Sequence, residues 1–232
     1  MVKHFLLSLV FLVAIAPTWA QSNNCSQYYP MQEGATFQYT TYNKKGKKEG
    51  VIDYTIKEVV NKGAITQAKM EMKLTDKKGK QHPMEYGFSC EGDMVKIDFE
   101  SIMPQEMLNQ LGPSAEIKMN GTDIELPNNL SVGQELSDAN VDITMDMGPV
   151  NMKMGVKTIN RTVEKSEKVS TPAGDFDCLV LYEDHVVKPP MGKEQSSPSR
   201  TWIAEGVGMI KQISYNKKGD VISTSELTAF SK

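Results

Sequence analysis

Methionines are the side chains whose spacing in this sequence most clearly suggests chemistry. Two M-x-M units, residues 145–147 and 152–154, are separated by the four residues 148–151. Thioether sulfurs are soft ligands that suit Cu(I), so a copper site is one interpretation. Methionine is also an adaptable apolar side chain, so the same units could belong to a core or line a cavity for an apolar ligand. The three interpretations stay open at this point.

The residue types that serve catalysis form no recognisable constellation. His82 and His185 each lack a second histidine at the spacing of an HExxH zinc site, and no GxSxG motif is present. The segment 206–208 (GVG) lacks the third glycine of a dinucleotide loop. Glu183 and Asp184 are neighbours and would face opposite sides of a strand, whereas glycosidases need two facing carboxylates. We therefore predict a protein that is not an enzyme and that has no metal and no cofactor.

Three cysteines permit three single pairings and leave one thiol over. Cys178 lies in an apolar run that is typical of an interior strand, where a free thiol behaves as a small apolar group. Cys25 precedes the first expected strand, and Cys90 ends a strand before a turn. We expect a Cys25–Cys90 disulfide, with no bridge as the alternative.

The first twenty residues have the features of a cleaved secretory signal. A short basic start is followed by an apolar run from Phe5 to Ala16, which is too short to span a bilayer, and by small residues up to Ala20. Cys25 lies five residues past Ala20 and not at the cleavage point, so we expect no lipid anchor. These features predict a signal peptide at 1–20 and a single periplasmic or secreted domain at 21–232 with no membrane span.

Charge and composition exclude further classes of protein. The formal net charge is −3, whereas nucleic-acid-binding proteins are usually strongly basic, so we expect no nucleic-acid partner. The apolar fraction is 39%, and the charges are mixed along the chain. Because disorder requires low hydrophobicity together with high net charge, the composition favours a folded domain.

Three similar units predict hairpin tips. The segments 43–46 (NKKG), 76–79 (DKKG) and 216–219 (NKKG) are each flanked by alternating apolar residues. Asn or Asp at the first position accepts hydrogen bonds within a type I turn, and Gly at the fourth adopts a positive φ at little cost. The lysine pairs could form a patch that binds an anionic surface, or they could simply keep the tips solvated.

The methionine units predict a fourth hairpin with a defined register. If residues 148–151 form the loop, Pro149 takes the second position of a type I turn. One face is then apolar and the other carries two opposite-charge pairs. The expected pairs are Met147 with Met152, Met145 with Met154, Ile143 with Val156, Asp146 with Lys153 and Asp142 with Lys157.

Alternating apolar residues over most of the remaining chain predict further strands, and residues 101–111 predict one short helix. The fold class is therefore all-β, with one strongly curved antiparallel sheet that forms a half-open or closed barrel. We expect the helix to act as a lid over a concave apolar face. The predicted cavity-lining residues are Met103, Met107, Met145, Met147, Met152 and Met154.

Several segments also resemble a known family. The segments 169–178 (VSTPAGDFDC) and 201–211 (TWIAEGVGMIK), together with Tyr28–Pro30 and the loop 126–133, resemble an exported bacterial domain-of-unknown-function family described as TapB-like or 3108-like. The resemblance implies a curved antiparallel sheet, distantly like the periplasmic lipoprotein carriers, and no catalytic residue. It also implies a cysteine near Tyr28, which supports the Cys25–Cys90 pairing.

Together these expectations predict a non-enzymatic exported binding or carrier module for an apolar ligand or lipid. The alternative is a structural or interaction protein of the cell envelope, with a filled core and no ligand. The sequence names no protein partner.

Overall fold

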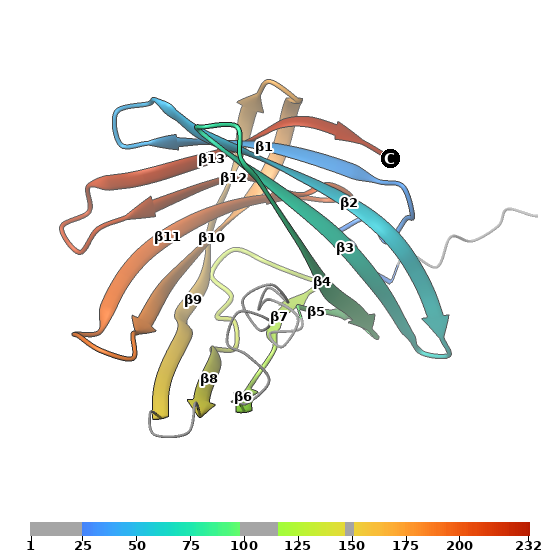
Figure 1. The fold of residues 1–232 in the computed structure, drawn as a ribbon. Helices are drawn as coiled ribbons and strands as arrows, with labels where there is room; N and C mark the ends of the chain where they lie inside the picture. The colour runs from blue at the N-terminus through green and yellow to red at the C-terminus, as the bar shows by residue number, and fades with distance from the viewer. Residues whose placement is uncertain (1–24, 98–115, 147–150) are drawn as a thin grey trace, which may run out of the picture.

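The computed structural model describes residues 25–97, 116–146 and 151–232, which form an all-β domain (Figure 1). In these ranges no helix is long and apolar enough to cross a membrane. The predicted helix at 101–111 lies outside the described residues, as do the signal peptide and Met103, Met107 and Met147. The strands are β1 (Thr36–Asn43), β2 (Lys48–Lys62), β3 (Ile65–Asp76), β4 (Gln81–Glu91), β5 (Met94–Ile97), β6 (Glu116–Gly121), β7 (Ile124–Pro127), β8 (Ala139–Asp146), β9 (Asn151–Thr171), β10 (Gly174–Lys188), β11 (Gln195–Ala204), β12 (Gly208–Tyr215) and β13 (Val221–Ser231).

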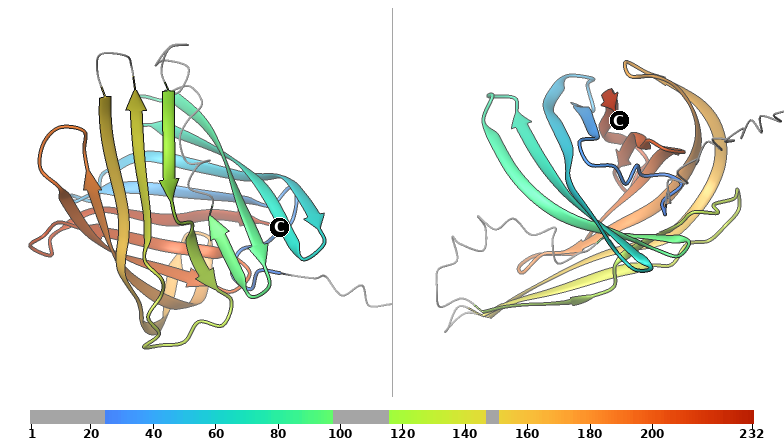
Figure 2. Two further views of the ribbon diagram at one scale, coloured as in Figure 1. Left: turned by 90° about the horizontal axis from the view of Figure 1, so that it is seen from below. Right: turned by 90° about the vertical axis from the view of Figure 1, so that its right-hand side faces the viewer.

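All thirteen strands belong to one antiparallel sheet in the order β6-β8-β9-β10-β11-β12-β13-β1-β2-β3-β4-β5-β7. Figure 2 shows that this sheet is strongly curved, as predicted. It is not closed into a barrel, because β6 and β7 are its two edge strands and do not pair with each other. The predicted half-open or closed barrel is therefore not supported, and the fold of the described residues is one large curved antiparallel sheet with two free edges. The chain itself joins the two edges through Thr122 and Asp123.

The three predicted hairpin tips are confirmed. In the tip between β1 and β2, the side-chain oxygen of Asn43 accepts hydrogen bonds from the backbone N–H groups of Lys45 (2.9 Å) and Lys47 (3.2 Å). Gly46 completes this turn with a φ of 70°. Asp76 and Asn216 accept the equivalent pairs of bonds in the tips between β3 and β4 and between β12 and β13.

The main core lies in the concavity of the sheet. Its buried side chains come both from β1–β4 and from β9–β12, so they can meet only on the inner side of the curve. The segment 25–35 also enters this core, where Tyr28 and Ala35 are buried. A Cys25–Cys90 disulfide, with an S–S distance of 2.08 Å, ties this segment to β4. The predicted pairing is confirmed.

Cys178 is the free cysteine, and it is buried on β10 as expected. Burial raises the pKa of its thiol to about 11, with Asp177 and Glu167 adding to the effect. The thiol therefore stays protonated at neutral pH and packs as an apolar group.

The predicted register of the methionine hairpin is wrong by two residues. Met145 faces Met152 and Ile143 faces Met154, whereas the prediction paired Met147 with Met152 and Met145 with Met154. Since a shift of two residues preserves the side-chain alternation of a strand, the apolar residues still share one face.

The charge pairs predicted for the opposite face are lost with that register. Asp146 faces Asn151 and Asp142 faces Gly155. The observed register continues beyond β8 to a bridge between Glu135 and Thr162. The whole length of the two paired segments therefore fixes the register. A pair of exposed cross-strand charges contributes only about 0.2–1 kcal/mol and does not override it.

Candidate functional site

A pocket lined by tyrosines lies within the concave face. Its volume is about 150 Å³. The lining combines strands β1–β4 with β12 and with the segment that the disulfide holds in place. The lining residues are Tyr29, Phe37, Tyr39, Tyr54, Met70, Tyr86 and Met209.

Cross-strand packing and two hydrogen bonds fix the aromatic rings of this tyrosine pocket. The ring of Tyr54 is nearly perpendicular to those of Tyr39 (centroids 5.6 Å apart) and Tyr86 (6.2 Å). The Tyr39 hydroxyl donates to the backbone carbonyl of Met209 at 2.8 Å, and the Tyr86 hydroxyl donates to the sulfur of Met70 at 2.9 Å. The walls are therefore preformed.

Tyr29 reaches the pocket because a glycine leaves room for its ring. Gly208 has a φ of +90°, and a Cβ at this position would lie 2.6 Å from two ring carbons of Tyr29. The backbone of Tyr29 is fixed by a hydrogen bond from its N–H to the hydroxyl of Ser26 (2.9 Å). A side chain at position 208 would displace the ring.

Burial keeps the tyrosine hydroxyls protonated. It raises the pKa of Tyr29 and of Tyr54 to about 12 and raises the pKa of Tyr39 and Tyr86 well above the ordinary value. Among the described residues, the hydroxyls of Tyr29 and Tyr54 have no hydrogen-bond partner. The pocket is thus apolar with two neutral hydroxyls available to a ligand.

A largely buried ion pair joins Arg161 and Glu183. Arg161 is 3% exposed, and its Nε lies 3.4 Å from Oε2 of Glu183, while its Nη1 donates to the carbonyl of Ser137 at 2.6 Å. Burial alone would raise the pKa of Glu183, but His185 and Arg161 more than offset that effect and hold the pKa below its ordinary value. The pair also acts on the pocket electrostatically: after burial, the negative charge of Glu183 raises the pKa of Tyr29 further, and the positive charge of Arg161 lowers it.

A bulge in β9 turns Arg161 into this position. Thr162 faces Tyr182 and Ile159 faces Asp184, so two residues of β9 are opposite Glu183 alone. Asn160, the first of these two, has a φ of 55°. Such a bulge bends the strand and redirects the next side chain.

His185 contacts three groups, but their geometry differs from that of a catalytic triad. Its Nε2 lies 3.1 Å from Oγ of Ser199 and 3.3 Å from Oε1 of Glu183, and its Nδ1 lies 3.4 Å from Oγ1 of Thr158. A serine triad uses one ring nitrogen for the serine and the other for the acid. Here serine and acid share one nitrogen. In the described ranges, no three His, Cys, Asp or Glu side chains are grouped to hold a metal ion.

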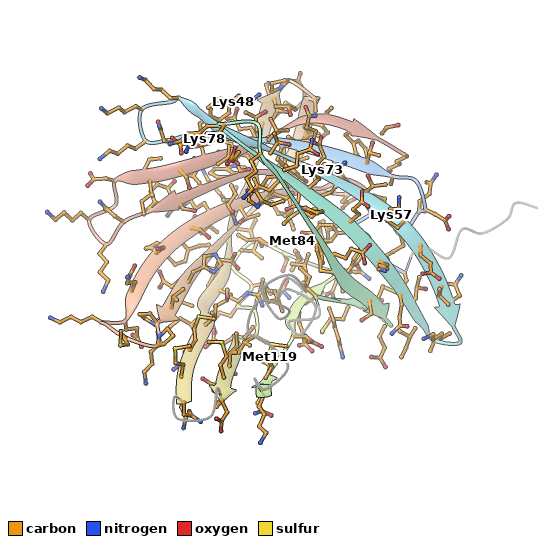
Figure 3. The ribbon with its side chains drawn as sticks, viewed as in Figure 1. Lys48, Lys57, Lys73, Lys78, Met84 and Met119 are labelled. Atoms are coloured by element: carbon orange, nitrogen blue, oxygen red, sulfur yellow. A yellow bond between two sulfur atoms is a disulfide. The ribbon has the colours of Figure 1, made fainter. Side chains whose placement is uncertain are left out.

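The methionines predicted to line the cavity lie apart from the tyrosine pocket. Met145 is buried with Ile143 in a second cluster, against which Met119, Val141, Met152 and Met154 pack. Figure 3 labels Met119 on β6, at the end of the sheet that is formed by β6, β8 and β9. Three of the predicted site residues, Met145, Met152 and Met154, are thus brought together, but in a separate apolar cluster.

Sequence reasoning missed the tyrosines and Arg161. The alternation of Phe37 and Tyr39 with polar residues does indicate one shared face of a strand. No local pattern indicates that Tyr54 and Tyr86 meet them there, because this depends on three strand registers.

Comparisons with known proteins agree with the observed architecture. The model of the DUF3108-like family matches residues 32–227. A solved chain from Bacteroides fragilis, provisionally described as an exported protein with a YmcC-like fold, is 18% identical, with a TM-score of 0.69 over 90% of this chain and 100% of that chain. A Parabacteroides distasonis chain, provisionally described as a lipoprotein, is 19% identical, with a TM-score of 0.71 over 89% and 99%. At these identities the likeness concerns the fold. No curated protein matches this chain.

Proposed function

Because the chain belongs to the DUF3108-like family and carries a preformed tyrosine pocket on its concave face, we propose that it is an exported binding module for an apolar or weakly polar ligand. The pocket is the observation that carries the proposal. Ligand sites are typically concave and mostly apolar, with a few polar groups that orient the ligand. The apolar part of the wall comes from Phe37, Met70 and Met209, and the polar groups are the hydroxyls of Tyr29 and Tyr54.

An apolar wall beside the pocket offers room for a longer ligand. Met72 lies directly opposite Tyr54, and Met84 lies opposite Met72, so the three side chains share one face of the sheet. Ile52 and Leu74 form a neighbouring pair on that face. All of these side chains remain partly exposed. Because a pocket of about 150 Å³ accepts only one ring or a short alkyl segment, an acyl chain would extend along this wall.

Export is supported by the Cys25–Cys90 disulfide, because such bonds form and persist in oxidising compartments outside the cytoplasm. The buried, protonated thiol of Cys178 is compatible with the same environment.

A role without catalysis is supported by the geometry around His185. The imidazole that contacts Ser199 is not oriented by a carboxylate at its other nitrogen, as a general base for serine would be. Glu183 is engaged by Arg161 and His185 at once, and these contacts hold its pKa low, which disfavours the protonated form that a general acid requires.

The proposal is tested by titrating the purified exported chain with a fluorescent fatty acid and with a small aromatic probe. We expect saturable binding that Tyr54→Trp weakens, because the larger indole fills the pocket. Tyr182→Trp is the matched control, since Tyr182 packs on Arg200 away from the pocket. Native mass spectrometry of protein purified from its own envelope would identify a bound ligand. Equal binding by both variants, or no binding at all, would reject the proposal.

One observation favours a second candidate, an interaction protein of the envelope whose concavity is simply core. The tyrosine pocket is smaller than the roughly 300–1,000 Å³ of most ligand sites. An empty native spectrum together with no saturable binding would favour this candidate.

A further inference from the structure

Four hairpin tips lie side by side along one rim of the sheet. Consecutive hairpins of an antiparallel meander leave the sheet at alternate ends, so the β1–β2, β3–β4, β10–β11 and β12–β13 tips share one end, which runs from the top of Figure 1 down its left side. Asn43 faces Ser223 and Gly50 faces Asp76, which brings three of these tips together. The fourth tip adjoins them, because residues 194–197 line one shallow depression together with residues 216–218, Asp220 and Ile222. We call residues 43–48, 76–80, 188–194 and 216–220 the basic rim.

The basic rim concentrates positive charge on an acidic protein. It contains eleven lysines and three carboxylates, a net charge of +8, whereas the whole chain carries −3. All eleven lysines are exposed, and none forms an ion pair within the described residues. Figure 3 labels Lys48 and Lys78 at two of the tips. The lysines are Lys44, Lys45, Lys47, Lys48, Lys77, Lys78, Lys80, Lys188, Lys193, Lys217 and Lys218.

Exposed apolar side chains gather at the same rim. Of the five large hydrophobic side chains that are exposed among the described residues, four lie in or next to these tips. Met191 is 88% exposed, Ile222 is 44% exposed, Val221 is 38% exposed and Val187 is 37% exposed. Lysines alone would keep hairpin tips soluble, but that role gives no reason to expose aliphatic side chains among them.

We propose that the basic rim docks the protein on a lipid bilayer that carries anionic headgroups. Lysines near such a surface are attracted to its negative potential, and aliphatic side chains gain by entering the boundary between headgroups and acyl chains. The rim contains no arginine, so it lacks the planar groups that recognise individual phosphates in specific pockets. Diffuse attraction to a charged surface fits this composition, and a soluble polyanion would leave Met191 and Ile222 without a role.

The test measures partition of the exported chain onto vesicles of phosphatidylglycerol and phosphatidylethanolamine, with phosphatidylcholine vesicles as the neutral comparison. We expect binding to the anionic vesicles that weakens as salt is raised. The variant K44E/K45E/K217E/K218E should bind at least tenfold more weakly. Its matched control is K57E/K62E/K153E/K157E, which makes the same change in net charge at exposed lysines outside the rim.

A second variant separates a bilayer from other polyanions. M191N/I222N retains every charge, and it should lose binding to anionic vesicles while its binding to heparin is unchanged. The docking proposal is overturned if the two lysine variants bind vesicles equally, if the native chain does not distinguish anionic from neutral vesicles, or if M191N/I222N binds vesicles like the native chain. Far-UV circular dichroism of each variant establishes that it is folded. The result does not depend on the tyrosine pocket, which lies elsewhere on the sheet.

Discussion

Removing the disulfide should destabilise the protein by an amount that the structure allows us to estimate. The Cys25–Cys90 bond closes a loop with a sequence separation of 65 residues. In the chain-entropy model, a cross-link over a loop of this length stabilises the folded state by about 4 kcal/mol at 25 °C. For a chain of this size, that loss lowers the midpoint of thermal unfolding by on the order of 10 °C.

The side chains themselves contribute to the effect and need a control. Cys90 is fully buried, so the double variant C25A/C90A also removes a buried sulfur. C178A removes a buried sulfur without removing a cross-link, because Cys178 is free. We expect C178A to cost about 1 kcal/mol. The difference between the two variants then reports the cross-link.

Urea unfolding, monitored by circular dichroism, provides the measurement for both variants and for native protein treated with a reductant. The segment that begins at Cys25 has other attachments, since Asn128 donates to the carbonyl of Cys25 at 2.6 Å and Gly206 donates to that of Gln27 at 2.8 Å. We therefore expect the reduced protein to stay folded but less stable. If C25A/C90A and C178A differ by less than about 1 kcal/mol, the loop-closure reasoning is wrong for this chain.

Three further predictions follow from single residues. Gly208→Ala should destabilise by about 1–3 kcal/mol more than Gly219→Ala in urea unfolding, because both positions have a positive φ but only the first Cβ would meet the ring of Tyr29; equal costs would contradict the proposed contact. Glu183 has a lower pKa in the folded protein than its ordinary value of 4.5, so its ionised form stabilises the fold above pH 4.5 and this stabilisation is lost as the pH falls through the folded-state pKa. The thermal midpoint of E183Q should therefore fall less than that of the native protein over this pH range. Cys178 should react with iodoacetamide far more slowly at pH 8 in the native protein than in urea, because its thiol is buried and its pKa is about 11; equal rates, followed by mass spectrometry, would exclude a protected thiol.

Local chemistry made some parts of this fold predictable from the sequence. The tip at Asn43 depends on one side-chain acceptor and on a glycine three positions later, and both are visible in the sequence. The Cys25–Cys90 bond was predictable because Cys178 lies in an apolar strand. Each inference used the local sequence around the groups concerned, and the family resemblance supported the disulfide.

Features that depend on distant registers were not predictable in this way. The turn residues around Pro149 suggested one pairing of β8 and β9, but that pairing is fixed over a longer stretch that reaches Glu135. The tyrosine pocket requires four strands and a glycine on a fifth to be in register. Arg161 points inward because of a bulge that its sequence context does not signal.

The short link between β6 and β7 limits how far the two edges of the sheet can separate where it joins them. These strands are opposite edges of the sheet, yet only Thr122 and Asp123 separate them. Three Cα steps of extended chain span roughly 10 Å, so this tether sets a maximum distance between the end of β6 and the start of β7. Its β6 end is held closely, because a Cβ at Gly121 would overlap the carbonyl oxygen of Asn140. If the concavity were to widen for a bulkier ligand by separation of these strand ends, the link at residues 122–123 would have to be longer. Substitution of side chains that line the concavity would instead change its shape and polarity without changing the distance between the edges.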